Sequence, residues 1–261
     1  MTPLSEKFQN LKQILDSYDT VLVAFSGGCD SAFVAKAARD VLGRERVKAV
    51  TSKSESLPQS EIREAESFTR QFDIDHCWIQ TREIENPNYA SNPVNRCYFC
   101  KTELYEHLKN LAAQWNVKTI ANGVNVDDLG DWRPGLRAAR EYQVKSPLVE
   151  AGLVKAEIRE LSRQLGLPTW DKPAAACLSS RFPYGQGITP EKLRQVDLGE
   201  ALLKEYGFRV VRLRHFGNYA KVELGKDEVD GLLSDFELAQ KIKAKLKEIG
   251  FESVEIDPEG Y

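Results

Sequence analysis

The sequence predicts an α/β protein, in which a doubly wound parallel sheet of the Rossmann-like type is followed by a small C-terminal α+β domain. In the first half of the chain, short apolar runs alternate with segments of helical spacing, and this alternation is typical of a parallel sheet with helices on both faces. After Gly185 the pattern changes to a helix, two strands of alternating polarity and a further helix. We therefore expect one domain over residues 1–185 and a second over residues 186–261.

The elements of the first domain are predicted from apolar runs and from their spacing. A helix is expected around Leu11 and Leu15, and the stretch 85–96, with two prolines and four asparagines, is expected to form a loop. Buried parallel strands are expected at 20–25, 47–52, 74–80 and 117–123. Helices are expected at 31–43, 58–72 and 97–115.

The second domain is predicted from caps and from alternating polarity. A helix is expected to start after Thr189, which can cap it, with Pro190 at the first helical position. The stretches FRVVRLRHF and YAKVEL alternate like two antiparallel strands joined by a short Gly–Asn turn. Residues 226–249 predict one long helix, and FESVEID at 251–257 predicts a last strand.

Composition places the chain among globular proteins. Of its 261 residues, 42% are hydrophobic, and 36 basic residues nearly balance 39 acidic ones, which argues against a broad nucleic-acid surface. No stretch has the roughly 18 apolar residues of a membrane span, and the N-terminal stretch has helical spacing rather than the apolar core of a signal peptide. We expect a cytoplasmic protein, in which the five cysteines are reduced.

The segment SGGCDS, which begins at Ser26, joins the first predicted strand to the following helix. Gly27 and Gly28 permit backbone angles and close approaches that a side chain would block, and successive N–H groups at a helix start can bind an anion. Ser31 adds a second hydroxyl, and Asp30 would hold a cation such as Mg²⁺ between itself and a phosphate. The segment lacks the Lys-Ser/Thr ending of a Walker A loop.

This segment resembles the PP-loop of the adenine-nucleotide alpha-hydrolase superfamily, whose members bind the β,γ-pyrophosphate of ATP and transfer AMP to an oxygen atom of the substrate. The resemblance implies ATP and Mg²⁺ as cofactors. Ser52, at the end of the second predicted strand, and Gly123, at the end of the fourth, lie at the sheet edge where such folds bind the adenosine. For Ser52, an ordinary serine at a strand end is the alternative. Cys29, at the variable position, is expected to pack under the loop.

Three cysteines indicate sulfur chemistry. Cys177 lies among three alanines and two serines, so its thiol is expected to be accessible, and Arg181 could favour its thiolate. Cys97 and Cys100 have the CxxC spacing of a metal site at a predicted helix start, with a chance pair of helix cysteines as the alternative. Zinc would require a fourth protein ligand, whereas three thiolates on a [4Fe–4S] cluster would leave one iron open to carry sulfide.

The whole chain resembles the LarE family, and four segments carry the resemblance. They are the PP-loop, NGVNVDDLGDWRPGLRAARE (122–141), ACLSSRFPYG (176–185) and VRLRHFGNYAKVEL (211–224). LarE enzymes are ATP-dependent sulfur transferases that build the nickel-pincer nucleotide cofactor of lactate racemase. The resemblance implies adenylation of a carboxylate of pyridinium-3,5-biscarboxylic acid mononucleotide, release of pyrophosphate, and insertion of sulfur to give a thiocarboxylate.

The source of the sulfur differs within the family that the chain resembles. Some members sacrifice the cysteine that matches Cys177, and others have a CxxC that joins this cysteine in holding an iron–sulfur cluster. Cys97 and Cys100 place this chain with the second group, and sacrifice of Cys177 is the alternative. The family association also implies a homo-oligomer, with sulfide or a sulfur-donor protein as a further partner.

The resemblance implies roles for further residues in three segments. The catalytic residues are expected to be Asp30, Cys177 and Arg181. Substrate contacts are expected from Asp128 and Arg133, with Asp127 and Asp131, in the loop after the fourth strand, and from Ser180, Arg181, Arg212 and Arg214, with Glu200 and Glu223 as further candidates. Arg212 and Arg214 alternate along one strand, so both point to one face and could bind the phosphate of the mononucleotide. Without the resemblance, the loop after the fourth strand would be predicted to form a solvated, capped turn. Arg212 and Arg214 would then be predicted to lie on an exposed strand face.

Two other functions are compatible with the PP-loop. A tRNA thiolase would also combine this loop with three cysteines and a cluster, but it requires an RNA-binding surface, which the charge balance does not predict. A protein that only senses nucleotide would use the loop without chemistry, and the three cysteines would then have no role. Release of pyrophosphate separates an enzyme from a sensor, and the accepted substrate separates the two enzymes.

Overall fold

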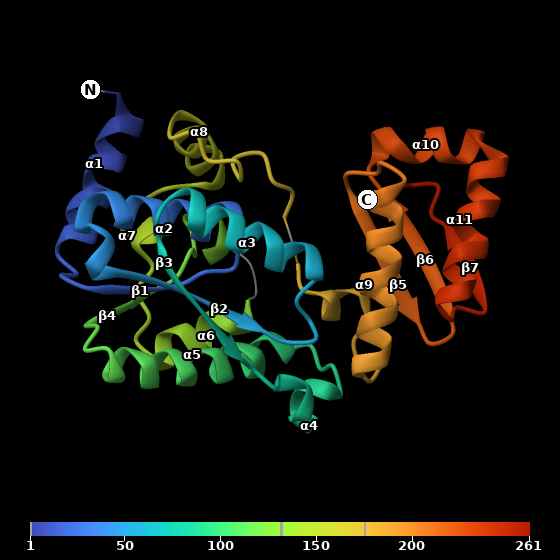
Figure 1. Cartoon of the computed structure of the whole chain (residues 1–261), viewed down its shortest axis with the longest axis horizontal. Coiled ribbons are helices and arrows are strands. Elements are labelled where there is room, and N and C mark those ends of the chain that lie inside the picture. Colours follow the sequence, from blue (N-terminus) through green and yellow to red (C-terminus); the bar gives the residue numbers. More distant parts are fainter. Residues whose placement is uncertain (1, 131–132, 175) are drawn as a thin grey trace. The chain divides into compact units, whose positions relative to one another are not determined.

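The computed structural model describes residues 2–130, 133–174 and 176–261. It confirms the predicted fold class, with a four-stranded parallel sheet flanked by helices and a small mixed sheet of three strands (Figure 1). The chain divides into two compact units: unit 1 consists of Met1–Ser54, Glu61–Glu83 and Asn95–Ala175, and unit 2 of Glu55–Ser60, Ile84–Val94 and Ala176–Tyr261. The main segment of unit 2 thus begins ahead of the boundary that the sequence predicts between residues 185 and 186.

All predicted strands are present, and most predicted helices differ only at their ends. The elements that lie wholly or mainly in unit 1 are α1 (Pro3–Asp16), β1 (Val21–Ala24), α2 (Cys29–Leu42), η1 (Arg44–Arg46), β2 (Val47–Lys53), α3 (Gln59–Gln71), β3 (Asp75–Gln80), α5 (Arg96–Gln114), β4 (Thr119–Ala121), η3 (Val126–Leu129), α6 (Pro134–Glu141), α7 (Pro147–Glu150) and α8 (Lys155–Gln164). Those of unit 2 are η2 (Glu83–Glu85), α4 (Pro87–Ala90), η4 (Leu178–Arg181), α9 (Pro190–Glu205), β5 (Val211–Phe216), β6 (Tyr219–Leu224), α10 (Lys226–Ser234), α11 (Phe236–Ile249) and β7 (Ser253–Ile256).

The large sheet has the strand order β3-β2-β1-β4, and all of its strands are parallel. The chain adds β2 and β3 on one side of β1 and then crosses to the other side for β4. In open sheets of this kind, ligands bind outside the carboxyl ends of the strands where the order reverses. The fold therefore predicts a ligand site at the ends of β1 and β4.

Both faces of this sheet are covered by helices, which explains the unbroken apolar run in β1. Val21 and Val23 belong to a core with residues of α1, α2, α7 and α8. Leu22, which points to the opposite face, packs with residues of α5 and α6. Figure 1 shows α5 and α6 on one side of the sheet and α1, α2 and α8 on the other.

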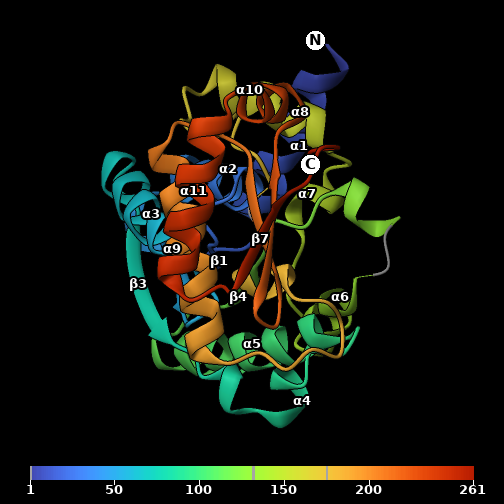
Figure 2. The ribbon, with the colours of Figure 1, turned by 90° about the vertical axis from the view of Figure 1, so that its right-hand side faces the viewer.

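Unit 2 has its own sheet and its own core. Strand β6 lies between β5, with which it pairs antiparallel as predicted, and β7, with which it pairs parallel (Figure 1). Figure 2 shows α9 and α11 on the same side of β7. The prediction of one helix over 226–249 is wrong, because α10 ends at Ser234 and α11 begins at Phe236. Between them, the Asp235 side chain accepts a hydrogen bond of 3.0 Å from the backbone N–H of Leu238 and so caps a new helix.

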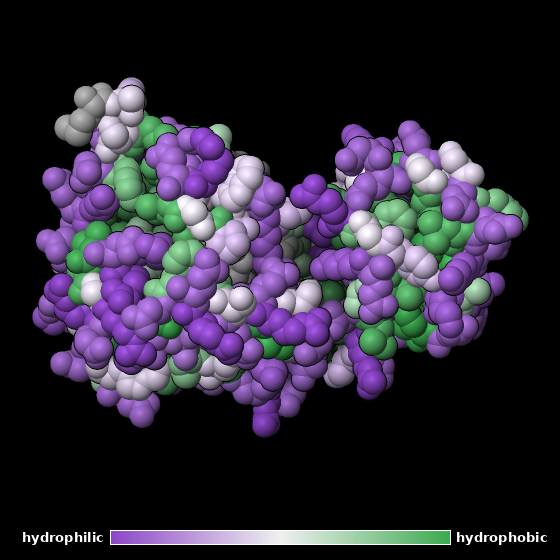
Figure 3. Space-filling model, turned by 45° about the horizontal axis from the view of Figure 1, so that its top comes forward, coloured by the Kyte–Doolittle hydropathy of each residue, from purple (hydrophilic) through white to green (hydrophobic). Residues whose placement is uncertain are grey.

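The described part of the chain contains no helix that is long and apolar enough to cross a membrane. The face drawn in Figure 3 mixes hydrophilic side chains with smaller groups of hydrophobic ones.

Candidate active site

The PP-loop connects β1 to α2 through a tight turn. Gly27 has φ +73°, in the left-handed region that favours glycine, and Gly28 precedes the first residue of α2. The Ser31 hydroxyl accepts a hydrogen bond of 3.1 Å from the backbone N–H of Ser26 and lies 3.0 Å from the Ser26 hydroxyl oxygen. The folded loop therefore lies at the positive end of α2, where the first N–H groups have no partner inside the helix.

Gly123 lies against the start of α2, and its assignment to the nucleotide site stays a prediction. A Cβ atom at position 123 would lie 2.7 Å from the backbone nitrogen of Ser31, so a side chain there would displace the PP-loop helix. The segment after β4 thus packs directly against the start of the PP-loop helix. Ser52 is half-buried near the carboxyl end of β2, and its predicted contact with adenosine stays a prediction.

Asp30, in the first turn of α2, has one paired and one unpaired carboxylate oxygen. Its Oδ2 atom lies 2.6 Å from the Nζ atom of Lys155. Its Oδ1 atom is buried and has no hydrogen-bond partner. A buried carboxylate oxygen without a partner is unfavourable, and a divalent cation prefers such an oxygen ligand. The side chain therefore fits the Mg²⁺ that the sequence predicts between Asp30 and a phosphate.

A second lysine contacts the PP-loop from the segment that follows α8. The Lys172 Nζ atom donates to the Gly27 carbonyl oxygen at 3.1 Å and lies 2.6 Å from Glu61 and 2.7 Å from Glu64, both on α3. Burial acts to lower the pKa of Lys172, but its hydrogen bonds and charge interactions with the two glutamates outweigh this effect and raise it. Lys172 is therefore a cation beside the loop.

The sequence analysis missed both lysines, although the position of Lys155 at a helix start could have identified it. It is the first residue of α8, where a positive charge is unfavourable because the helix dipole is positive there. A lysine at such a position indicates a nearby carboxylate or a bound anion. No sequence feature identifies Lys172 in this way, since its partners lie on the PP-loop and on α3, far from it in sequence.

Cys29 packs beneath the loop, as expected. Its side chain is 3% exposed, and its sulfur lies 3.8 Å from the hydroxyl oxygen of Ser162 on α8. Burial raises the pKa of the thiol above its usual value. Cys29 is therefore a neutral packing residue in this structure.

The acidic loop after β4 is held by hydrogen bonds of its own. Asp127 accepts a hydrogen bond of 2.8 Å from the backbone N–H of Lys155 and so caps α8. Asp128 pairs with Arg133, with 2.7 Å between Oδ1 and Nη1. These are the contacts of a capped turn, and a substrate role for Asp128 and Arg133 stays a prediction. Asp131 lies outside the described residues.

Two of the three predicted cluster cysteines lie near the start of α5. Cys97 is exposed and Cys100 is half-buried, and their spacing of three residues places them on one side of the helix. Cys177 belongs to unit 2, where it is exposed and precedes η4. None of the three cysteines is in a disulfide, and cysteine thiolates are the ligands that an iron–sulfur cluster takes. Among the described residues, however, no three His, Cys, Asp or Glu side chains are placed together to hold a metal ion.

Arg181 is buried, and its guanidinium group is bound by neighbours within unit 2. It is 2% exposed and forms a two-point pair with Glu200, at 2.7 Å from Nε and 3.0 Å from Nη2. Its Nη1 atom donates to the carbonyl oxygens of Ala176, at 2.9 Å, and of Cys177, at 3.2 Å, and to the Ser180 hydroxyl at 2.8 Å. Arg181 therefore orders the backbone that carries Cys177, and the substrate contacts expected of Arg181 and Ser180 stay predictions.

Replacing Glu200 by glutamine should lower the free energy of unfolding of unit 2 by about 3–5 kcal/mol, since it leaves the buried guanidinium of Arg181 without a counter-charge. Urea unfolding followed by far-ultraviolet circular dichroism, which includes the helices and strands of unit 2, measures this loss. Glu205→Gln is the matched control, because Glu205 is exposed at the end of the same helix. Equal stability of the two variants would contradict a structural role for the Arg181–Glu200 pair.

Arg212 and Arg214 lie on one face of β5, as predicted. Both guanidinium groups lie over the ring of Tyr261, at 4.9 and 5.8 Å from its centre. Arg214 also contacts Glu223 at 2.8 Å and donates to the carbonyl oxygen of Ser180 at 3.0 Å. Arg212 is only 8% exposed, so this is not an exposed strand face.

The chain is similar to several known proteins. A model of the NAD synthase family matches residues 5–110. The chain is 33% identical over 261 residues to the pyridinium-3,5-bisthiocarboxylic acid mononucleotide synthase of Lactiplantibacillus plantarum, with 100% of this chain and 94% of the relative covered. It is 45% identical to an uncharacterized protein of Synechocystis sp., with 99% and 96% covered, and 27% identical to one of Methanocaldococcus jannaschii, with 99% and 94% covered.

Proposed function

Because the chain belongs to the family of pyridinium-3,5-bisthiocarboxylic acid mononucleotide synthases, the LarE family, we propose that it is an ATP-dependent sulfur transferase acting on pyridinium-3,5-biscarboxylic acid mononucleotide. It activates a carboxylate of this substrate as the adenylate and then replaces the activated oxygen by sulfur, which gives a thiocarboxylate. The observation that carries the proposal is the pairing of Asp30 with Lys155 at the PP-loop.

In the activation step, a carboxylate oxygen of the substrate attacks the α-phosphorus of ATP. The bond from this phosphorus to the α,β-bridging oxygen breaks, and pyrophosphate leaves with the electron pair. The PP-loop and the positive end of α2 bind the pyrophosphate, and Asp30 would hold Mg²⁺ through its unpaired oxygen. Once the cation binds Asp30, Lys155 can move its ammonium group to a phosphate oxygen. It then provides the phosphate-facing lysine that the loop itself lacks.

In the second step, a sulfur nucleophile delivered at Cys177 attacks the acyl carbon of the adenylate. The bond from this carbon to the oxygen shared with AMP breaks, and AMP leaves with the electron pair. We propose that Cys97, Cys100 and Cys177 hold a [4Fe–4S] cluster, which supplies an open iron for sulfide when it is bound. Arg181 orders the segment that presents Cys177, through the carbonyl oxygen of that residue. Sacrifice of Cys177 as the sulfur donor is the alternative.

Arg212 and Arg214 are candidates for binding the phosphate of the substrate. Two guanidinium groups on one strand face suit the bidentate binding of a phosphate, and the Tyr261 ring beside them offers an aromatic surface. A homo-oligomeric state, a cytoplasmic location, and sulfide or a donor protein as the sulfur source complete the proposal, and they rest on the family resemblance and the composition.

The proposed function is tested with anaerobically purified protein, MgATP and the biscarboxylic acid mononucleotide. Chromatography of the nucleotides should show AMP and pyrophosphate, formed only when the mononucleotide is present. Transfer RNA in place of the mononucleotide should give neither product. Formation of ADP would contradict the assignment of the PP-loop, and AMP formation with tRNA alone would indicate a tRNA thiolase.

A further inference from the structure

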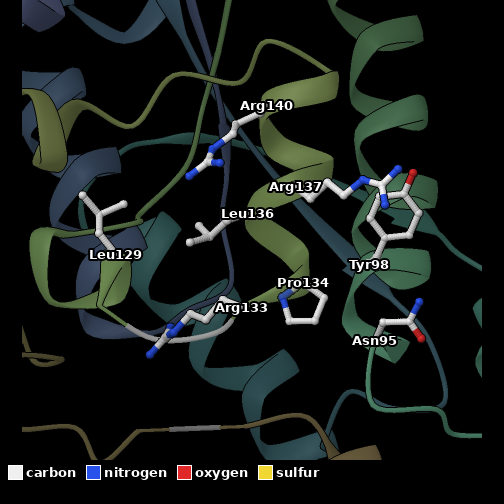
Figure 4. Close-up of a pocket in the computed structure, with 8 residues that line it drawn as sticks. All are labelled: Asn95, Tyr98, Leu129, Arg133, Pro134, Leu136, Arg137 and Arg140. Carbon is white, nitrogen blue, oxygen red and sulfur yellow. The ribbon is translucent and has the colours of Figure 1, made fainter.

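Unit 1 contains a cavity of about 410 Å³ that the PP-loop does not line. Three arginines from one short segment face it, together with aromatic, apolar and amide side chains. We call it the arginine pocket, and its lining residues are Asn95, Tyr98, Leu129, Arg133, Pro134, Leu136, Arg137 and Arg140 (Figure 4).

The spacing of the arginines along α6 explains why they face one cavity. Arg133 immediately precedes α6, and Arg137 and Arg140 follow at intervals of four and three residues, which places all three along one helix face. The start of α5 forms the opposite wall. Gly135 permits the two helices to approach closely, because a Cβ atom there would already lie 3.1 Å from the Lys101 side chain on α5.

Two of the three arginines are fixed by carboxylates. Arg133 pairs with Asp128 at 2.7 Å. Arg137 pairs with Glu141 at 2.7 Å and lies over the ring of Tyr98, 4.8 Å from its centre. The Tyr98 hydroxyl donates to the same glutamate at 2.7 Å. These contacts hold the walls of the pocket in place.

The third arginine carries a charge that no described residue balances. Within the described ranges, no carboxylate or other acceptor contacts the Arg140 guanidinium, and this side chain is exposed. Figure 4 shows Arg140 and Arg133 directed toward the side of the pocket where Leu129 lies, with Leu136 between them, while Arg137 points to Tyr98. Leu129 is 51% exposed. The pocket thus combines a free cation with an apolar wall, which is the composition of a site for a small organic anion.

The position of the arginine pocket relates it to the substrate. Leu129 and Arg133 lie in the connection after β4, and the carboxyl end of β4 reaches the PP-loop through Gly123. Resting on the proposed function, we propose that the arginine pocket binds an anionic group of the mononucleotide, either its ring carboxylate or its phosphate, through Arg140. Both groups suit a guanidinium, which binds them in two-point fashion.

The test measures the binding of two fragments of the substrate in the absence of ATP. Pyridine-3,5-dicarboxylate carries only the carboxylates, and ribose 5-phosphate carries only the phosphate. Isothermal titration calorimetry with the wild type and with Arg140→Gln should show that the variant binds one of the two fragments at least about 10-fold more weakly, the loss expected for one charge-assisted pair. Weaker binding of pyridine-3,5-dicarboxylate would show that the pocket binds the ring carboxylate, and weaker binding of ribose 5-phosphate would show that it binds the phosphate.

Two further variants make the result specific. Arg140→Lys retains the charge and should recover part of the lost affinity. Arg70→Gln, at an exposed position near the end of α3, removes the same charge elsewhere in unit 1 and should bind like the wild type. Equal affinities of the wild type and Arg140→Gln for both fragments, or no binding of either fragment, would overturn the assignment of the pocket.

This experiment is separate from the test of the proposed function. If a fragment binds through Arg140 but no AMP forms from ATP and the mononucleotide, the pocket stands and the proposed function fails. If AMP forms while Arg140→Gln binds both fragments like the wild type, the proposed function stands and the pocket inference fails.

Discussion

Replacing Asp30 by asparagine should lower the rate of AMP formation by about 10²- to 10³-fold, the loss typical of removing one preorganised charge contact at a site where negative charge develops. Asparagine has nearly the same size, but it cannot pair with Lys155 as an anion and is a poorer ligand for Mg²⁺. The measurement is the initial rate of pyrophosphate release with saturating MgATP and substrate. Asp40→Asn, at an exposed position on the same helix, should retain the wild-type rate.

A double-mutant cycle can test whether Asp30 and Lys155 act together. Lys155→Met keeps the length of the side chain and removes its charge. Because the two groups are in contact at 2.6 Å, we expect the combined loss in the double variant to be clearly smaller than the sum of the two single losses in ΔΔG‡. Additive losses would show that the pair does not act as a unit. A rate for Asp30→Asn within a factor of two of the wild type would contradict its assignment to the nucleotide site.

Replacing any one of Cys97, Cys100 or Cys177 by alanine should abolish both iron retention and multiple turnover. The reason is that two thiolates cannot hold a [4Fe–4S] cluster that normally has three or four cysteine ligands. Iron and acid-labile sulfide are measured on anaerobically purified protein, and product is counted per chain. Cys77→Ala is the control, since Cys77 lies half-buried in β3 and should not affect either value.

Sacrifice of Cys177 predicts a different set of results. Each chain would then turn over once, and Cys177 would lose about 34 Da, the mass of one H₂S, when its thiol is converted to dehydroalanine. The Cys97→Ala variant would remain fully active. Mass spectrometry that finds this loss in an active Cys97→Ala variant would rule out the cluster and leave the assignment of the PP-loop unchanged.

Much of unit 1 could be predicted from sequence because its organising interactions are local or repeat along the chain. The apolar runs of β1 and β2 and the helices between the strands follow from periodicity. The PP-loop could be recognised because its glycines and hydroxyls act within six consecutive residues. In the same way, the alternation of Arg212 and Arg214 correctly predicted a shared face.

The contacts of the site with distant residues could not be predicted in this way. Lys155 reaches Asp30 across 125 residues and Lys172 reaches Gly27 across 145, and no periodicity in the sequence relates such positions. The partner of Arg181 was missed for a similar reason, since Glu200 lies on the next helix and comes into contact only through packing. These pairings depend on tertiary structure.

The break between α10 and α11 shows a different limit. The apolar spacing of a helix continues through residues 226–249, so periodicity alone predicts a single element. One side chain decides the outcome, because Asp235 offers its carboxylate to the N–H of Leu238 and starts a second helix. Attention to possible caps inside a long apolar pattern would have identified this position.

Unit 2 is built from three stretches of chain that are synthesised at different times. A ribosome releases the residues 55–60 and 84–94 well before the stretch that begins at Ala176. In the finished fold, the Leu178 N–H donates to the carbonyl oxygen of Ser56, and the Tyr89 hydroxyl lies 2.6 Å from the Ser179 hydroxyl. Until the last stretch emerges, neither hydrogen bond can form. Unit 2 must therefore complete its fold late in translation. It is also not an exchangeable module, because a graft of the stretch from Ala176 alone would leave these two groups behind.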